Sequence, residues 1–393
     1  MNLISKISKF NIMFLKPKKV WRKPKKIQVL VYDRMGSENF VPYLKNYDYS
    51  IFDVRGESIN ITCLFRCLFK INFWSKSAFE CYIETYISLA SPKALITFID
   101  NDFRFWKISK KSLGVKTFFV QNGLRGTMGD VFGFIQPSED YRVDYMFVFG
   151  EVIGKKFAEY ISGKVVASGS FKNNMFLATE KFSNDTVLFI SQWRPRPSQD
   201  AIFVEEEGKS ASWEDYFLAE QKILTYLDTW CFERNKKLFI AGAKIHETDR
   251  EKSFYSNFLQ KCDWIFLPRN GNSGIYEYIN YTEMVVCIDS TAGLEAIARG
   301  KRTAIFCCRE VFTNIFSRRF GWPGNYPVEG LFWTNSIEQD NVRKIMDYIA
   351  GVDQNSFLEI TEKYSRELMA YDCNNSQFVS SLYSTVISCP TRI

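Results

Sequence analysis

Two hydroxyl side chains, Ser290 and Thr291, stand where a buried strand is expected to turn into a helix. The apolar run 284–288 predicts the strand, and residues 293–299 predict the helix. Hydroxyls at the start of a helix cap its first N–H groups, and these N–H groups together with the helix dipole attract phosphate. Glu295 falls on the same helix face as Thr291, where its carboxylate could bond a ribose hydroxyl. The pattern therefore predicts either a phosphate-binding turn or an ordinary helix cap.

The single histidine, His246, follows a predicted strand over 237–241. Parallel strands end at the same edge of a sheet, so His246 would face the same cleft as Ser290. There an imidazole could bond a phosphate or give a proton to a leaving group, although an isolated histidine can equally be structural. With one histidine and no Cys-x-x-Cys pair, a zinc site is not expected.

Polar side chains also gather after the predicted strands of the first half of the chain. They are Glu38, Arg55, Glu57, Asp100, Asp102, Gln121, Asn122 and Arg125. A carboxylate from Asp100 or Asp102 could act as base or nucleophile, and the two amides could hold sugar hydroxyls. Asp-Asn-Asp at 100–102 also matches a short pattern for metal-bound nucleotide sugars, but we expect no metal requirement.

Arginines and lysines of the second half could bind a diphosphate or a carboxylate. Arg194, Arg196 and Arg309 are the candidates for this role. Lys301 and Arg302 are expected to form a solvated basic rim instead. Arg194 joins Glu38, Arg55, Glu57 and Arg125 as a predicted substrate ligand.

The elements that must position these residues repeat a strand–helix pattern in both halves. Short apolar runs are expected to be parallel strands buried on both faces, at 27–33, 49–55, 94–99, 116–120, 145–149 and 164–167, and again at 186–191, 237–241, 264–267, 284–288 and 303–308. Helical stretches between them predict two doubly wound α/β domains with a cleft between. The chain has no GxGxxG, GxxxxGK[ST] or GxSxG motif, which disfavours dinucleotide redox chemistry, P-loop hydrolysis and a serine nucleophile elbow.

The length and apolar content of the chain are consistent with two domains. The 393 residues, 46% of them hydrophobic, are enough for two cores. We expect a basic leader at 1–26, a first domain at 27–175, a linker at 176–184, a second domain at 185–350, and C-terminal helices at 351–393 that could cross back to the first domain. The ten cysteines form no Cys-x-x-Cys pair and are expected to be reduced thiols of a cytoplasmic protein.

The leader carries nine of the lysines and arginines and no acid, although the whole chain has a net charge of only +7. Its apolar and basic residues alternate, which favours a segment lying on an anionic membrane surface over a solvated tail. No apolar run approaches the ~20 residues that span a bilayer. Nucleic acid is not an expected partner, because the other charges nearly balance and no binding motif is present.

Six strings together resemble a known family: Val31–Glu38, Val54–Asn60, Ile96–Asp102, Val120–Arg125, Val286–Lys301, and Phe320–Pro323 followed by Gly330–Asn335. They are similar to bacterial surface-carbohydrate biosynthesis proteins from O-antigen and capsule loci, which are built on the GT-B glycosyltransferase fold. The resemblance covers nearly all of the chain to about Asn335. It implies two Rossmann-like domains with an interdomain cleft.

A more distant similarity links the chain to Kdo transferases and bacterial sialyltransferases, which use CMP-activated 2-keto sugars. Those enzymes carry an acidic-residue–Gly motif, a His-Pro pair and a Ser/Thr pair, and the matching positions here are Gln121-Asn122-Gly123, His246-Glu247 and Ser290-Thr291. Asn122 stands in place of the expected carboxylate, so Asp100, Asp102 or Asp130 would have to serve as the base. Glu247 replaces the proline, which weakens the match at His246.

These resemblances imply a cytoplasmic glycosyltransferase at the inner face of the cell membrane. It would transfer a sugar from a nucleotide donor, with a CMP-activated 2-keto acid sugar as the expected donor, to a lipid-linked surface glycan, without a cofactor. The implied nucleotide ligands are Gln192, Asp289, Ser290, Thr291 and Glu295. The implied catalytic residues are Asp100, Asp102, Gln121, Asn122 and His246. A teichoic-acid type CDP-polyol phosphotransferase and a non-catalytic scaffold for polysaccharide assembly are the alternatives.

Overall fold

The computed structural model describes residues 17–70, 73, 77–111, 114–126, 131–177, 183–197, 202–206, 208–271 and 274–388. Residues 1–16 of the predicted leader, most of the linker and Asp130 lie outside this part. Within it, no helix is both long enough and apolar enough to cross a membrane.

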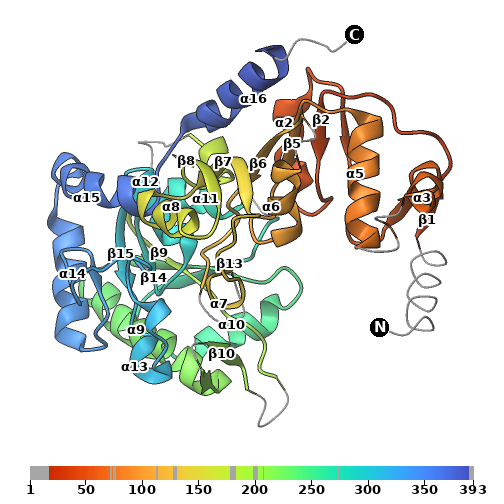
Figure 1. The fold of residues 1–393 in the computed structure, drawn as a ribbon. Helices are drawn as coiled ribbons and strands as arrows, with labels where there is room; N and C mark the ends of the chain where they lie inside the picture. Colours follow the sequence, from red (N-terminus) through yellow and green to blue (C-terminus); the bar gives the residue numbers. More distant parts are fainter. Residues whose placement is uncertain are drawn as a thin grey trace.

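The first domain is a parallel sheet with the strand order β3-β2-β5-β6-β7-β8 (Figure 1). Its strands are β2 (Val29–Val31), β3 (Tyr49–Ile51), β5 (Ala94–Thr97), β6 (Lys116–Val120), β7 (Arg142–Val148) and β8 (Ser162–Ala167). Successive side chains of a strand point to opposite faces, so Leu30 packs beneath one helical layer and Val29 and Val31 beneath the other. The central strands are apolar throughout because both faces are covered.

Helices cover both faces of this sheet. One face holds α3 (Ile61–Leu68), α5 (Ala78–Ala90), α6 (Phe103–Lys110) and α8 (Glu151–Ala158). The other holds α2 (Val41–Leu44) and the C-terminal α16 (Ser376–Ser388). Phe378 of α16 packs edge-on against Phe118 and Phe147, so the end of the chain completes the core of the first domain.

The second domain is another parallel sheet, with the order β13-β12-β9-β14-β15-β16 (Figure 1). Its strands are β9 (Ser183–Ile190), β12 (Lys237–Ala241), β13 (Trp264–Leu267), β14 (Thr282–Cys287), β15 (Arg302–Phe306) and β16 (Trp333–Thr334). Its helices are α9 (Trp213–Glu233), α10 (Thr248–Ser256), α11 (Gly274–Tyr281), α12 (Thr291–Ala298), α13 (Glu310–Thr313), α14 (Gln339–Gly351) and α15 (Gln354–Leu368). A small antiparallel pair, β10 (Val204–Glu206) and β11 (Lys209–Ala211), precedes α9, and the short helix α7 (Val131–Phe134) belongs to the first domain.

The strand order of the second sheet creates a switch point at β9. In the second sheet β9 lies between β12 and β14, so the chain winds outward in both directions from there. Ligands of open α/β sheets bind outside the carboxyl ends of the strands at such a switch point. The residues at this point are Gln192 after β9 and Asp289 after β14, and the amide N–H of Asp289 donates to Oε1 of Gln192 at 3.4 Å.

Some sequence predictions need correction. The leader was expected to run to residue 26, but β1 (Lys18–Val20) pairs in parallel with β4 (Ser58–Asn60), so this part belongs to the folded domain. The C-terminal helices expected at 351–393 are α15 and α16; the chain leaves α15 after Leu368 and bonds to the first domain at Phe149 before α16 begins. The two-residue strand β16 is too short to leave a periodic signal.

Candidate functional site

A cavity of about 570 Å³ lies between the two domains, and we call it the main cavity. Its walls are the loops that follow β5, β6 and β8 in the first sheet and β9, β12, β13 and β14 in the second, together with part of α11. The volume is in the range of small-molecule sites. Of the residues predicted from sequence, those that line it are Gln121, Asn122, Gln192, Arg194, Asp289, Ser290, Thr291 and Glu295.

The N-terminus of α12 opens into the main cavity. Ser290 is the N-cap residue, and its Oγ accepts from the N–H of Ala292 at 3.3 Å. No described residue accepts a hydrogen bond from the N–H of Thr291. Gly293 lets the helix lie close to β14, because a Cβ there would stand 2.2 Å from Sγ of Cys287. The N-terminus of α12 therefore faces the cavity with the N–H of Thr291 free of any described acceptor. The helix dipole favours an anion at this position.

Positive charge dominates the walls of the main cavity. Its basic lining residues are Lys172, Arg194, Lys244, Arg269 and Arg318, and its acidic ones are Asp289 and Glu295. The basic residues come from both domains, and Arg309 further neutralises Asp289 from beneath. A cavity with this balance suits a ligand that carries two or more negative charges.

Glu295 joins the two domains beneath the cavity. Its carboxylate accepts from the hydroxyl of Tyr276 at 3.3 Å and from Ser170 of the first domain, and its backbone oxygen accepts from Nδ2 of Asn173. Burial raises the pKa of the Glu295 carboxyl, although the hydrogen bonds from Ser170 and Tyr276 oppose this. A buried carboxyl with a raised pKa in a ligand cavity is typical of functional sites.

We expect Glu295→Gln to stabilise the protein above neutral pH by a few degrees in melting temperature. A carboxyl with a raised folded-state pKa stabilises the fold below its unfolded pKa, and this contribution is lost as the pH rises through the folded value. The amide has no such loss, so the two proteins should converge at low pH and separate on raising it. Thermal melts from pH 4 to 9 would show this, with exposed Glu359→Gln as control. Parallel pH curves for Glu295→Gln and wild type would contradict the assignment.

A buried arginine fixes the loops that form the cavity floor. Arg309 is fully buried; its guanidinium pairs with Asp289 and with Glu220 at 3.1 Å, and donates to Oε1 of Gln192 at 3.0 Å. The ring of Tyr216 stacks against it, 4.2 Å from centroid to guanidinium carbon. These contacts tie the loops after β9 and β14 to α9.

A second network extends from the same glutamate to the loop after β12. Tyr255 donates to Oε1 of Glu220 at 2.6 Å and lies 2.5 Å from Oγ of Ser191. Ser191 in turn bonds Glu251, whose carboxylate accepts from the N–H groups of Ala243 at 2.8 Å and Lys244 at 3.2 Å. Three strand-end loops are therefore held in one hydrogen-bonded frame.

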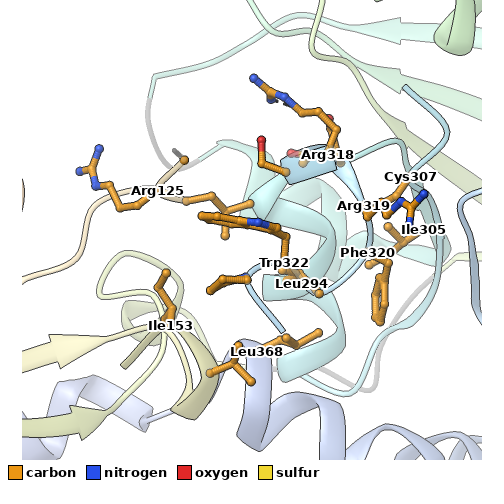
Figure 2. Close-up of a pocket in the computed structure, with 18 of the residues that line it drawn as sticks. Arg125, Ile153, Leu294, Ile305, Cys307, Arg318, Arg319, Phe320, Trp322 and Leu368 are labelled. Atoms are coloured by element: carbon orange, nitrogen blue, oxygen red, sulfur yellow. Dashed lines mark ion pairs between the residues drawn. The ribbon is translucent and has the colours of Figure 1, made fainter. Parts of the chain in front are cut away.

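A smaller cavity of about 170 Å³, whose lining residues Figure 2 shows, also meets the N-cap of α12 at Ser290. Apolar side chains, among them Ile153, Leu294 and Trp322, line it, and Arg125 and Arg318 stand at its margin. The residues that line both cavities are Leu124, Asp289, Ser290 and Arg318. At this junction Oδ2 of Asp289 is buried and accepts no hydrogen bond from the described residues; Arg318 forms an ion pair with it at 3.8 Å.

A family model described as "putative O-antigen biosynthesis protein" matches residues 118–385, more than half of the chain. The chain belongs to this O-antigen biosynthesis family. A search of curated proteins found no match.

Solved structures show how the fold of this family member relates to others. The "putative UDP-N-acetylglucosamine 2-epimerase" of Listeria monocytogenes is 11% identical, with a TM-score of 0.53 over 93% of this chain and 98% of its own. S. aureus MnaA in complex with UDP is 13% identical, with a TM-score of 0.51 over 93% and 98%. The UDP-GlcNAc 2-epimerase of Methanocaldococcus jannaschii is 11% identical, with a TM-score of 0.50 over 91% and 99%. At these identities the likeness shows the fold alone, and the predicted GT-B fold with two Rossmann-like domains is confirmed.

In this O-antigen family member Asp100 and Asp102, two of the acidic residues predicted as base or nucleophile, do not line the main cavity. Asp100 is fully buried, and Arg125 pairs with it, donating from Nε at 2.7 Å. Asp102 is the N-cap of α6. Its carboxylate accepts from the backbone N–H of Arg104 at 2.9 Å and forms an ion pair with the Arg104 guanidinium at 2.8 Å. A carboxylate held by an arginine away from the cavity is not placed to take a proton from a substrate there. The role predicted for either residue therefore has no support in the geometry.

The two amides after β6 line the cavity but are also tied to the fold. Gln121 is buried, donates to the backbone oxygen of Gly123 at 2.9 Å and accepts from the N–H of Phe149 at 2.8 Å. Asn122 is more exposed; its Nδ2 donates to the oxygen of Phe98 at 2.7 Å, and its Oδ1 accepts from Arg125. Their arrangement shapes the wall and leaves little hydrogen-bonding capacity at Gln121.

The remaining predicted residues lie outside the lining. His246 is exposed in the bend before α10, two residues beyond the cavity-lining Lys244. Arg55 pairs with Asp33 at 2.9 Å, and Glu57 accepts from the N–H of Arg55 at 3.1 Å. Glu38 is exposed and lines neither cavity.

Three basic residues of the second half have different surroundings from those predicted. Lys301 is buried, its Nζ donates to the oxygen of Thr282 at 2.8 Å, and burial lowers its pKa to about 8. Arg302 pairs with Glu283 at 2.8 Å. The predicted solvated rim is wrong for both. Arg196 is exposed and pairs with Glu214 instead of lining the main cavity.

Proposed function

We propose that this protein is a glycosyltransferase that moves a sugar from a nucleotide-activated donor to a surface-polysaccharide acceptor. One observation carries the proposal: the N-terminus of α12 opens into a predominantly basic cavity at the switch point of the second sheet. The donor phosphate would accept hydrogen bonds from the hydroxyls of Ser290 and Thr291 and from the N–H of Thr291, where the helix dipole also stabilises it. Glu295, one turn along, would accept from a ribose hydroxyl.

For the donor we propose a CMP-activated 2-keto acid sugar. Such a donor carries a phosphate and a carboxylate, so its two negative charges match the basic residues on both walls of the cavity. Lys172 from the first domain and Lys244 from the second could bind one anionic group each. No metal is required in this proposal, because lysine and arginine side chains supply the charge that a divalent ion would bring.

For the acceptor we propose a lipid-linked glycan whose reacting hydroxyl enters at the junction of the two cavities. Asp289 is the carboxylate found there, and its Oδ2 is available to accept a hydroxyl proton. The smaller cavity, with Trp322 on its wall, would receive an acceptor sugar ring. We further propose that the protein works at the inner membrane face, with Met1–Phe14 contributing to its attachment.

Donor turnover tests this proposal. The protein would be incubated with CMP-Kdo, another CMP-nonulosonate, UDP-sugars and CDP-glycerol, each with and without EDTA, and nucleotide release would be followed. We expect CMP release that EDTA does not abolish. Release from CDP-glycerol alone would instead favour the polyol phosphotransferase. If no donor releases its nucleotide and CMP, CDP and UDP cause no thermal shift, the result would favour a non-catalytic scaffold for polysaccharide assembly.

A further inference from the structure

A group of exposed aromatic side chains lies on the first domain, far from both cavities. Trp21, Phe65 and Phe69 are 68%, 56% and 88% exposed. Single exposed apolar residues are common on protein surfaces, but large aromatic ones gathered on one face mark a binding surface. Thr62 and Phe65 stand one turn apart on one side of α3, and Phe69 is the C-cap residue one turn further on.

Contacts of the backbone place Trp21 beside this side of α3. The hydroxyl of Thr62 donates to the backbone oxygen of Trp21 at 2.9 Å, and Nδ2 of Asn60 donates to the oxygen of Arg22 at 2.8 Å. β1 also pairs in parallel with β4, which leads directly into α3. The three aromatic side chains therefore belong to one surface, which we call the β1–α3 face.

The two segments that form this face carry charge of one sign. Segments 17–26 and 61–70 contain eight lysines and arginines and no acid: Lys18, Lys19, Arg22, Lys23, Lys25, Lys26, Arg66 and Lys70. All of these except Lys19 are exposed. Aromatic rings favour the interface between water and lipid, and lysines and arginines bind anionic headgroups, so the combination fits an anionic lipid surface.

The position of the face agrees with such a partner. β1 and α3 lie at the end of the first domain that points away from the second domain (Figure 1). A membrane bound there would leave the cleft between the domains open. Residues 1–16, outside the described part, precede this face in the chain, and their sequence also alternates apolar and basic residues.

We propose that the β1–α3 face is a membrane-docking surface, with Trp21, Phe65 and Phe69 inserted among the headgroups of an anionic bilayer. This goes beyond the proposed function, because it assigns a lipid-binding role to the folded domain itself. It does not depend on which sugar is transferred.

The test is co-sedimentation of the full chain with vesicles of phosphatidylcholine, with and without phosphatidylglycerol. We expect binding to the anionic vesicles that weakens with salt, and a triple variant Trp21→Ser, Phe65→Ser, Phe69→Ser whose partition coefficient is lower by about tenfold or more. A matched triple of similarly exposed aromatic residues elsewhere, Phe232→Ser, Tyr281→Ser, Tyr383→Ser, should bind like wild type. Melting temperatures would confirm that both variants fold.

Three results would overturn the proposal. Equal binding of the triple variant and wild type would assign attachment to residues 1–16 alone, which a deletion of Met1–Phe14 would verify. Equal binding to neutral vesicles would remove the role of charge. If the triple variant differs from wild type in molecular mass by sedimentation equilibrium but binds vesicles equally well, the face would be a contact between copies of the chain. None of these results touches the proposed sugar transfer, which donor turnover measures separately.

Discussion

Replacing both Ser290 and Thr291 by alanine should abolish the thermal protection that CMP, CDP or UDP gives to the protein. Ser290 caps α12 at the mouth of the main cavity, and Thr291 follows it as the first helical residue. Each hydroxyl that bonds a charged phosphate contributes about 1.5–3 kcal/mol, so losing two should weaken binding by about a hundredfold or more. Thermal-shift titrations with each nucleotide measure this directly.

The chain provides a matched control for the cost of losing a cap. Ser212 is the N-cap of α9, bonds the N–H of Asp215 at 3.1 Å in a capping box, and lies outside both cavities. Ser212→Ala should cost about 1 kcal/mol of stability, as Ser290→Ala would through capping alone, and yet leave nucleotide protection intact. If the double variant at 290 and 291 still responds to nucleotide, the donor phosphate lies elsewhere in the cavity.

Local patterns in the sequence were sufficient for all strands of the two large sheets except β16, and for the turn at Ser290, but not for β1, β4, β10 and β11. Apolar runs such as Val29–Val31 and Met284–Cys287 are buried on both faces, so burial and periodicity agree and the parallel sheets could be predicted. Capping chemistry likewise depends on neighbours in the chain, which is why the start of α12 was found. Lys244 and Arg269 were missed, although each stands within three residues of a predicted strand end, a signal that could have been used.

The roles of buried charges could not be predicted, because they depend on partners distant in the sequence. From the sequence Asp100 is a carboxylate at the end of a strand with no evident partner, but in the structure Arg125, 25 residues away, donates a hydrogen bond to it. Arg309 reads as a phosphate ligand, but Glu220, 89 residues away, and Asp289 hold it inside the fold. Arg318 reaches the junction of the cavities from a short 3-10 turn, Phe316–Arg318, that has no periodic pattern.

These buried ion pairs distinguish two kinds of residue: those that line the cavity and can contact a ligand, and those that hold the lining residues in place. Arg309 lines neither cavity, yet it contacts both Gln192 and Asp289, which lie next to each other at the switch point and line the main cavity. It is therefore a positioning residue for the floor of the site. Its loss should change the stability of the second domain and the geometry of the cavity together.

Arg309→Met should destabilise the second domain by about 3–5 kcal/mol, because it leaves Glu220 and Asp289 as buried carboxylates without their cation. Burial raises the pKa of Glu220 and Arg309 opposes this, so the variant should bind more protons on folding and regain part of its stability as the pH falls toward 5. Urea unfolding of both proteins at pH 5 and pH 8 measures the effect. Arg234→Met, which removes an exposed pair with Asp347, should cost no more than about 1 kcal/mol at either pH. An Arg309→Met variant that unfolds like this control would show that the buried cation is dispensable, and the frame that holds Gln192 and Asp289 would then need another source of rigidity.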